Sequence, residues 1–510
     1  MASTTSSGVL HSSTLTEWGR RVWSRISTLS PLSSTALIPS PLSPHTSRFS
    51  VPDEIKRAAE LLKNYRGREP VQIVSHMDVD GICAAALLSK ALARKGIEHR
   101  IKFVRMLYSE VVEELDPSPL TIFTDMGSSQ LSHLRRKYGS EKVIICDHHP
   151  PSGEGWEGLF HLNAHLLGMD GTKEISGTGM AFLLARELHP SNSDLSVLAV
   201  GGAVGDVQNA WGRLVGKNRE ILEEAVRTGR VVREMDLQLY GRYSRTLLQA
   251  LEGFTDPPIP GITHSSEGCL ELVRSLGIPL RGENGWRRPA DLTREEKKRL
   301  AGALLSLALN SVPPEFSKYV PGLILGEAYT LVGERPELRD AGEFATCLNS
   351  TARHEQPLIG LEVARGDRGP YLSAMLNLLR YHRSSLARGM ELIETEGVKL
   401  GEKGYLQYLD ATGVVKETFT GTLASLSLSS GRVDPLKPVV VMVREGGKVK
   451  VSARCSKLLF LKGLDLSSCL KRAAEGVGGE GGGHPVAGGA QVPEERVEEF
   501  LRLLEEEMLK

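Results

Sequence analysis

Acidic and histidine side chains follow four apolar runs of this sequence, and they are residue types that bind divalent cations. "VQIVS" (71–75) leads into His76, Asp78 and Asp80; "LTIFT" (120–124) into Asp125; "KVIIC" (142–146) into Asp147, His148 and His149; and "LSVLAVGGAVG" (195–205) into Asp206. Residues two apart in an extended segment point the same way, so we expect His76, Asp78 and Asp80 to share a face. A helix cap or a solvated turn explains one such motif, but four in series indicate a site.

Several carboxylates in one cleft cannot all stay ionised unpaired, because like charges raise each other's pKa. Two divalent cations would balance Asp78, Asp80, Asp125 and Asp206. The set is rich in oxygen, has some imidazole and lacks thiolate, which favours manganese or magnesium over structural zinc. We therefore predict two divalent cations, with Mn²⁺ preferred and Mg²⁺ as the alternative, in an arrangement suited to cleaving phosphoesters.

Short apolar runs alternate with helical patterns from residue 53 onward, which predicts an α/β fold with a mainly parallel sheet and helices on both faces. The four apolar runs read as strands of that sheet, so their acidic ends should meet at one edge, where ligands bind. Ser176, before "GTGMAFLLAREL", is interpreted as a helix N-cap rather than a nucleophile.

The organisation of the chain suggests three domains after an N-terminal tail. Residues 1–52 are rich in Ser, Thr, Leu and Pro and are interpreted as a disordered tail or a misassigned start, in preference to a transit-type segment. A catalytic domain at 53–253 precedes a mostly helical connector at 254–335, which opens on the proline-rich "FTDPPIPGI". A second α/β domain at 336–510 has strands in "YLQYLD", "KPVVVMV" and "KVKVSARC", a hairpin at "REGG" and a Gly-rich loop at 476–489.

Composition restricts the partners and the compartment. Lys+Arg and Asp+Glu are both 62, so nucleic-acid binding would need a local groove rather than an overall basic field. The six cysteines are scattered without a CxxC pair, which is typical of reduced thiols in a cytoplasm. No apolar run reaches the roughly 20 residues that cross a membrane, so we expect no membrane partner.

The motifs "SHMDVDG" (75–81), "TD" (124–125), "DHH" (147–149) and "GD" (205–206) occur in an order that resembles the DHH phosphoesterase superfamily. "GGGHPVAGGA" (481–490) after "KVSAR" (450–454) resembles its DHHA1 partner domain. Three more stretches are similar to the archaeal RecJ-like branch: "LNAHLLGMDGTKEISGTGMAF", "GRYSRTLLQALEGFTDPPIPGI" and "RDAGEFATCLNSTARHEQPLIGL". One departure is Ala164, where the pattern leads us to expect proline.

The resemblance implies a role for each residue of the motifs. His76 and Asp78 would bind one metal, Asp80, His148 and Asp206 the other, and Asp125 would bridge. His149 would contact the scissile phosphate, and Asp147 would orient the histidines. Gly482 and Gly483 would let backbone N–H groups approach a phosphate, and His484 and Arg454 would add charge-assisted contacts.

The function implied is that of a RecJ-like exonuclease on single-stranded DNA or RNA, acting in replication or repair, from a branch whose members include proteins associated with the GINS replication complex. An enzyme of the same chemistry on short oligonucleotides or cyclic dinucleotides is the alternative, and a replisome scaffold without catalysis is a third. Two interpretations of the basic segment 281–299 stay open: it would extend the surface that binds nucleic acid, or it is an ordinary solvated surface.

Overall fold

Five parallel strands form the sheet that carries most of the predicted metal ligands. The computed structural model describes residues 52–283, 285–385 and 387–510, so the tail predicted at 1–52 lies, apart from its last residue, outside the described residues. The strand order is β2-β1-β3-β4-β5 and every neighbouring pair is parallel, which confirms the predicted fold class. The strands are β1 (Val71–His76), β2 (His99–Val104), β3 (Leu120–Thr124), β4 (Lys142–Asp147) and β5 (Leu159–Asn163).

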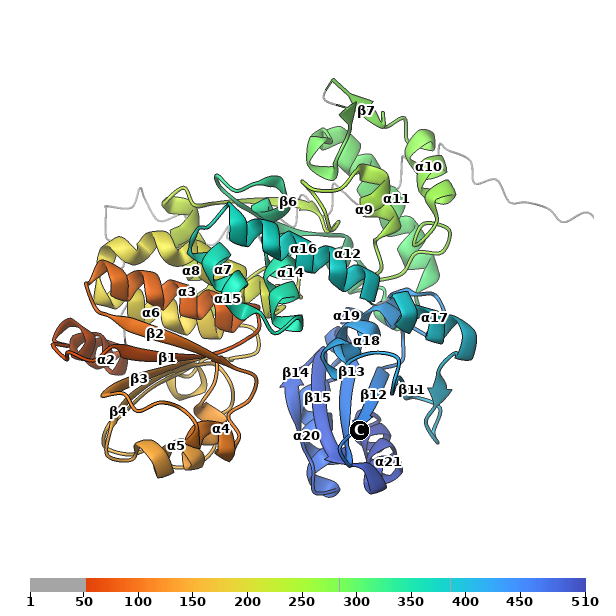
Figure 1. Cartoon of the computed structure of the whole chain (residues 1–510). Helices are drawn as coiled ribbons and strands as arrows, with labels where there is room; N and C mark the ends of the chain where they lie inside the picture. The colour runs from red at the N-terminus through yellow and green to blue at the C-terminus, as the bar shows by residue number, and fades with distance from the viewer. Residues whose placement is uncertain (1–51, 284, 386) are drawn as a thin grey trace, which may run out of the picture. The chain divides into compact units, whose positions relative to one another are not determined.

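Helices cover both faces of this sheet (Figure 1). Alternate residues of β1 enter different cores: Ile73 belongs to the larger cluster and Val74 to the smaller one. The larger core lies under α2 (Asp53–Lys63), α3 (Val79–Arg94) and α6 (Gly177–Leu188), and the smaller under α4 (Ser109–Glu113) and α5 (Leu131–Tyr138). Ser176 accepts a hydrogen bond from the Gly179 N–H at the start of α6, which confirms its prediction as an N-cap.

A further layer of helices completes the larger core. It contains α7 (Ser196–Gly205), α8 (Gly216–Arg227), α14 (Ala341–Arg353), α15 (Pro357–Arg365) and α16 (Pro370–Ser385). In this layer α7, α14 and α15 pack on α3, α8 packs on α6 and α7, and α16 packs on α14 and α15. Short helices α13 (Pro336–Arg339) and α17 (Ala387–Glu396) flank this group in the chain.

The run at 195–205 is helix α7, so its prediction as a strand is wrong. An apolar run without periodicity fits a buried helix as well as a buried strand. In this helix the glycines allow close packing, because α7 lies too near its neighbours for larger side chains at these positions. A Cβ on Gly201 would lie 2.9 Å from the Phe344 ring, and one on Gly202 would lie 2.3 Å from the Thr178 hydroxyl oxygen.

The C-terminal part of the chain forms a six-stranded mixed sheet in the order β10-β11-β12-β13-β15-β14. Its strands are β10 (Lys399–Leu400), β11 (Gln407–Asp410), β12 (Val439–Glu445), β13 (Lys448–Arg454), β14 (Glu480–His484) and β15 (Ala487–Pro493). The accompanying helices are α18 (Thr420–Ser429), α19 (Lys457–Lys462), α20 (Leu466–Gly476) and α21 (Val497–Met508). The predicted "REGG" hairpin joins β12 to β13 and is confirmed.

The segment predicted as a Gly-rich loop at 476–489 is largely the paired strands β14 and β15, so that prediction is wrong. Glycine suits this hairpin because α20 packs tightly onto it. A Cβ on Gly481 would lie 2.6 Å from the carbonyl oxygen of Leu470, and one on Gly488 would lie 2.3 Å from the Leu470 side chain. β14 is the outer strand of its sheet, so one row of its backbone N–H and C=O groups faces away from β15.

Residues 235–326 form a separate compact unit with an apolar core of its own. Its helices are α9 (Leu247–Glu252), α10 (Ser266–Ser275), α11 (Arg294–Ser311) and α12 (Val320–Ile324), and a small hairpin pairs β7 (Arg281–Gly282) with β8 (Gly285–Trp286). Strands β6 (Val231–Leu237) and β9 (Leu325–Leu331) pair where the chain enters and leaves this unit. Within the described ranges, no helix is both long enough and apolar enough to span a membrane.

Candidate metal centre

The predicted ligands lie at the carboxyl ends of the strands and at helix ends beside them. His76 ends β1, Asp78 is the N-cap of α3, and Asp80 lies in the first turn of that helix. The prediction that these three share the face of an extended segment is therefore wrong, because the chain turns into α3 at Asp78. Asp125 follows β3, and Asp206 is the C-cap of α7.

The predicted metal ligands fall into two groups whose potential ligand atoms lie within 4.8 Å of one another, and Asp125, Asp147, His148 and His149 form a third such group around the DHH motif. The first group is His76, Asp78 and Asp125; the second is Asp80, His148 and Asp206. Asp125 connects the groups: its Oδ2 lies 3.2 Å from His76 Nδ1 and its Oδ1 lies 3.2 Å from His148 Nε2. This division is the one that the resemblance implied.

Two buried atoms at this junction lack a hydrogen-bond partner, which is an argument that the site fits a cation. Asp125 Oδ1 and His148 Nε2 are both buried, and although they lie 3.2 Å apart, neither makes a hydrogen bond of good geometry. A buried carboxylate oxygen or imidazole nitrogen without a partner is costly. Both atoms are donors suited to a divalent cation, so the residues present fit the two metals predicted from the sequence.

Electrostatics also favour a positive ligand here. Burial raises the pKa of Asp80 well above its usual range, and the nearby Asp125 and Asp206 carboxylates raise it further. Burial lowers the pKa of His76, but Asp78 and Asp125 outweigh it, so that the pKa is raised well above its ordinary value. Cations bound among these groups would relieve the repulsion that raises the pKa of Asp80.

Asp80 is held in place by the start of α6. Its carboxylate accepts hydrogen bonds from the Gly177 N–H at 2.6 Å and from the Thr178 N–H at 3.1 Å, and the Thr178 hydroxyl donates to it at 2.6 Å. Glycine is required beside these carboxylates. A Cβ on Gly177 would lie 2.7 Å from Asp125 Oδ1, and one on Gly202 would lie 2.5 Å from Asp80 Oδ1.

Comparison with known proteins identifies the domains. Residues 70–201 match the N-terminal domain of the DHH family, residues 239–317 match the DHH-CID domain, and residues 431–510 match the DHHA1 domain. The chain is 30% identical over 460 residues to the uncharacterized protein MJ0831 of Methanocaldococcus jannaschii, covering 88% of this chain and 95% of that protein. The chain belongs to the DHH family.

Two solved structures share the fold of this DHH protein. RecJ of Thermus thermophilus, in complex with Mn²⁺, matches with a TM-score of 0.54 at 19% identity over 93% of this chain, which spans only 56% of that protein. CDC45 of Entamoeba histolytica matches with a TM-score of 0.59 at 15% identity over 90% of this chain and 99% of that one. Both comparisons show a shared fold.

The DHH motif itself separates ligand and orienting roles. His148 faces the ligand groups, while Asp147 Oδ1 accepts a hydrogen bond from the His149 ring at 2.8 Å and its Oδ2 accepts one from the Ser128 N–H at 3.0 Å. Burial lowers the pKa of His149, but the Asp147 carboxylate outweighs it and the pKa is raised. Asp147 therefore fixes the orientation of His149 and favours its protonated form.

Gln208 supports the second ligand group of the DHH protein and was missed by sequence reasoning. Its amide nitrogen donates to Asp206 Oδ2 at 2.7 Å and to the Gly171 carbonyl at 2.9 Å. His148 Nδ1 lies 2.6 Å from that same carbonyl, so Gln208 and Gly171 together orient two ligands. A glutamine two residues after a predicted ligand carries no signal of this role by itself.

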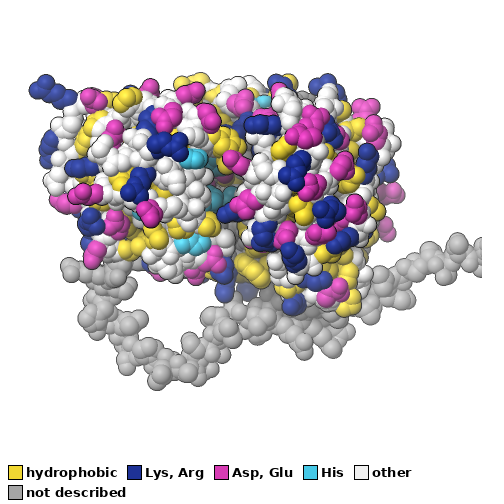
Figure 2. Space-filling view, turned by 90° about the horizontal axis from the view of Figure 1, so that it is seen from below, with side chains coloured by type: hydrophobic (Ala, Val, Ile, Leu, Met, Phe, Trp, Pro, Cys, Tyr) yellow, Lys and Arg dark blue, Asp and Glu magenta, His cyan; other side chains and the backbone are white. Residues whose placement is uncertain are grey.

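His484 lies against the ligands of the DHH protein rather than apart from them. Its Nδ1 is 3.0 Å from Asp206 Oδ1. Its ring is nearly parallel to that of His148, and the two ring centroids lie 6.1 Å apart. Histidine side chains are visible in a hollow on the face that Figure 2 shows. Gly482 and Gly483 precede His484 on β14, so the structure brings this strand to the metal site.

Arg454 lies beside Arg353, a second arginine to which the sequence motifs assign no role. A Cβ on Gly421 would lie 2.5 Å from Arg454 Nη2 and 3.6 Å from Arg353 Nη1. Burial lowers the pKa of Arg454 to about 9, and the charge of Arg353 contributes to the shift. Burial also lowers the pKa of Arg353, and Asp78 opposes this. Arg353 follows Asn349 by one turn of α14, and Asn349 accepts a hydrogen bond from the Val79 N–H, so this helix face borders the site.

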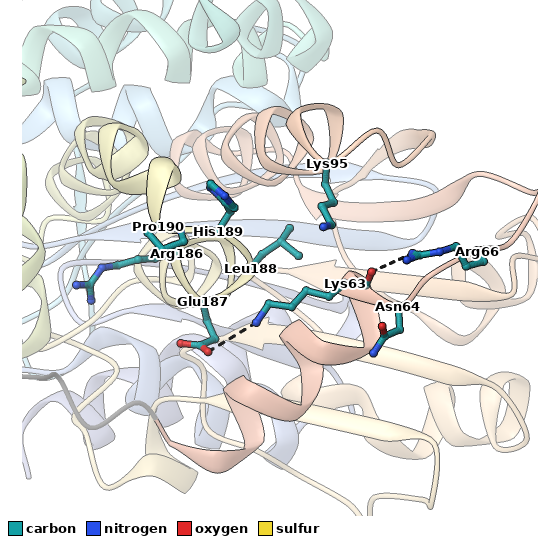
Figure 3. Close-up of a pocket in the computed structure, with 9 residues that line it drawn as sticks. All are labelled: Lys63, Asn64, Arg66, Lys95, Arg186, Glu187, Leu188, His189 and Pro190. Atoms are coloured by element: carbon teal, nitrogen blue, oxygen red, sulfur yellow. Dashed lines mark hydrogen bonds and ion pairs between the residues drawn. The ribbon is translucent and has the colours of Figure 1, made fainter.

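A separate hollow of about 620 Å³ contains none of the predicted site residues. Lys63, Lys95 and His189, at the ends of α2, α3 and α6, are among its lining residues (Figure 3). Positive charges near a helix C-terminus stabilise the helix by interacting with its dipole. Lys63 Nζ also lies 4.0 Å from Glu187 Oε1. These contacts explain the basic lining structurally.

Proposed function

We propose that this DHH protein is a metal-dependent phosphodiesterase that hydrolyses single-stranded nucleic acid from an end. The observation that carries the proposal is the pair of ligand groups sharing Asp125, with Asp125 Oδ1 and His148 Nε2 buried and without hydrogen bonds of good geometry. Oxygen-rich paired sites of this kind serve phosphoester cleavage. Because the overall composition is neutral, the nucleic-acid contacts would lie in the surroundings of this site.

The contacts support the following proposed roles. His76 and Asp78 would hold one divalent cation, Asp80, His148 and Asp206 the other, and Asp125 would serve both, with Mn²⁺ preferred. Bound divalent cations supply Lewis acidity, polarising a phosphoryl oxygen and lowering the pKa of water. His149, oriented by Asp147, would donate a hydrogen bond to the scissile phosphate.

A cluster of cations near the site supports a polyanionic strand as the substrate. It consists of Arg105, Arg353, Lys450 and Arg454. No carboxylate lies within ion-pair distance of Arg353, Lys450 or Arg454 among the residues that the structure describes. Burial and neighbouring positive charges lower the pKa values of Arg353, Lys450 and Arg454, so an anion would stabilise this cluster, and a phosphate backbone supplies several. His484 and the outward edge of β14 would contact the same strand.

The test is digestion of end-labelled single strands of DNA and of RNA with Mn²⁺ or Mg²⁺, beside duplex and dinucleotide controls. We expect cleavage of single strands, stronger with Mn²⁺, and poor cleavage of duplex. Much faster cleavage of the dinucleotide than of the long strand would instead favour the small-substrate alternative, and no cleavage of any substrate would refute the proposal.

The cation cluster can be tested separately with Arg454→Ala and, as a matched control, Arg432→Ala at an exposed position of the same domain. Arg454→Ala should weaken binding of long strands of any sequence and lower the dependence of binding on salt by about one counterion. Arg432→Ala should change neither.

Roles in replication or repair and association with GINS stay predictions from the resemblance.

A further inference from the structure

Three aromatic side chains lie together next to the cation cluster. The His354 ring is 5.4 Å from that of Tyr381 and 5.3 Å from that of Phe419. Tyr381 is on α16, His354 follows α14, and Phe419 precedes α18, so three separate elements bring these rings together. Figure 1 shows α14 and α16 side by side, in agreement with their packing.

The aromatic group begins where the cation cluster ends. His354 directly follows Arg353, whose guanidinium lies beside Arg454 and whose charge interacts with the ligand Asp78. Arg105, a member of the cation cluster, forms ion pairs with residues next to the aromatic rings. Its partners are Glu355 at 2.7 Å and Glu417 at 2.6 Å, the first next to His354 and the second two residues before Phe419. The metal ligands, the cation cluster and the aromatic rings therefore follow one another, and we call this succession of side chains the path.

Tyr381 is the exposed member of this group. Its side chain is 62% exposed, whereas Phe419 is buried and His354 is partly buried. Burial and the charge of Lys416 lower the pKa of His354, so its ring stays neutral. A neutral ring backs Tyr381 from one side and leaves a large part of the phenol accessible to solvent. An accessible aromatic face of this kind, beside a group of cations, is suited to stacking on a nucleic-acid base.

We propose that Tyr381, supported by His354, is a stacking platform for a base of the single-stranded substrate. The inference rests on the proposed function and names the residue that would make the enzyme prefer strands over dinucleotides. Single-strand-binding proteins combine a cationic track for the backbone with aromatic faces for the bases, and both features occur here in sequence along one path. Every base offers a π-face, so the contact would favour single strands without reading their sequence.

The test compares Tyr381→Ala and Tyr381→Phe with Tyr371→Ala, a control at an exposed tyrosine earlier on α16. Alanine favours helix at least as well as tyrosine, so both alanine variants should fold. With an oligonucleotide of about 20 nucleotides, Tyr381→Ala should raise KM about 5- to 20-fold, within the range of a lost stacking contact, and change kcat less than about twofold. KM for a dinucleotide should not change, and Tyr381→Phe should behave like the wild type.

A spectroscopic measurement makes the assignment specific. In a series of strands that carry 2-aminopurine at successive positions, stacking on Tyr381 should quench the fluorescence at one position. Tyr381→Ala should remove that quenching, and Tyr371→Ala should preserve it. If the wild type binds and cleaves single strands but Tyr381→Ala matches it in KM and quenching, the inference is overturned while the proposed function stands. If the wild type neither binds nor cleaves them, the proposed function fails first.

Discussion

Replacing Asp125 by asparagine removes the carboxylate that both ligand groups share. The backbone makes asparagine the informative substitution, because Asp125 has a φ of 58°, in the left-handed region. Asparagine tolerates this conformation, whereas alanine costs about 1 kcal/mol more there. Asp125→Asn therefore changes the charge and the ligand atom at nearly constant shape, and loss of activity cannot be attributed to backbone strain.

The size of the effect follows from the position of Asp125. Changing a residue that only orients a ligand typically costs about 10–100-fold in metal affinity or activity. Asp125 Oδ2 and Oδ1 face different groups, at 3.2 Å from His76 Nδ1 and from His148 Nε2, so the two losses multiply. We expect hydrolysis to fall by about 100- to 10,000-fold, or about 3–5 kcal/mol in the activation free energy.

The assay is single-turnover cleavage of an end-labelled single strand over a range of Mn²⁺ concentrations, with metal binding followed by calorimetry. Asp116→Asn is the matched control, since Asp116 is exposed and lies outside both ligand groups. Circular dichroism should show that both variants are folded. Hydrolysis by Asp125→Asn within tenfold of the wild type at saturating Mn²⁺ would refute the shared-ligand interpretation.

Three further predictions concern the supports of the fold and of the site. Gln208→Ala should reduce activity about 10–100-fold and require more Mn²⁺, because the amide that holds Asp206 is lost; an unchanged Mn²⁺ titration would contradict this. Gly481→Ala should destabilise the protein by about 1–3 kcal/mol in thermal unfolding, because its Cβ would lie 2.6 Å from a backbone carbonyl oxygen, whereas Gly322→Ala, with nothing within 4 Å, should not. Arg287 forms the hydrogen bonds that chiefly lower the pKa of Glu296 to about 2, so this pair stabilises the fold above about pH 4.5 and progressively less as the pH falls toward 2. The melting temperature of Arg287→Ala should therefore differ most from that of the wild type near pH 7, and an equal difference at pH 3 would show that the ion pair is not the cause.

The sequence predicts the strands and the ligand motifs because both are local. β1, β3 and β4 are short apolar runs that end in the acidic or histidine motifs, and parallel pairing brings those ends together without further information. The motif containing Asp206 was placed correctly beside the others even though its run is a helix, since α7 also ends at this edge of the sheet.

What the sequence does not reveal depends on contacts between distant segments. The role of Arg353 arises because α14 packs on α7 and α3, far away in the chain. The glycines near His484 read as a loop, because the sequence does not show that α20 lies close enough to exclude side chains. Likewise, the exposure of Tyr381 and its support by His354 follow only from tertiary packing.

The core of the catalytic domain is discontinuous in the chain, and this has a consequence for synthesis on the ribosome. Residues from β1 to β6 share their apolar core with Phe344 and Leu348 of α14, which emerge roughly a hundred residues later. At about 5–20 residues per second, the apolar surface of α7 stays uncovered for about 7–28 seconds and that of α3 for about 12–50 seconds before Phe344 is made. The unit at 235–326 is made during that interval and has its own core. We therefore expect the nascent catalytic domain to depend on chaperones or on slow collapse until α14 is complete.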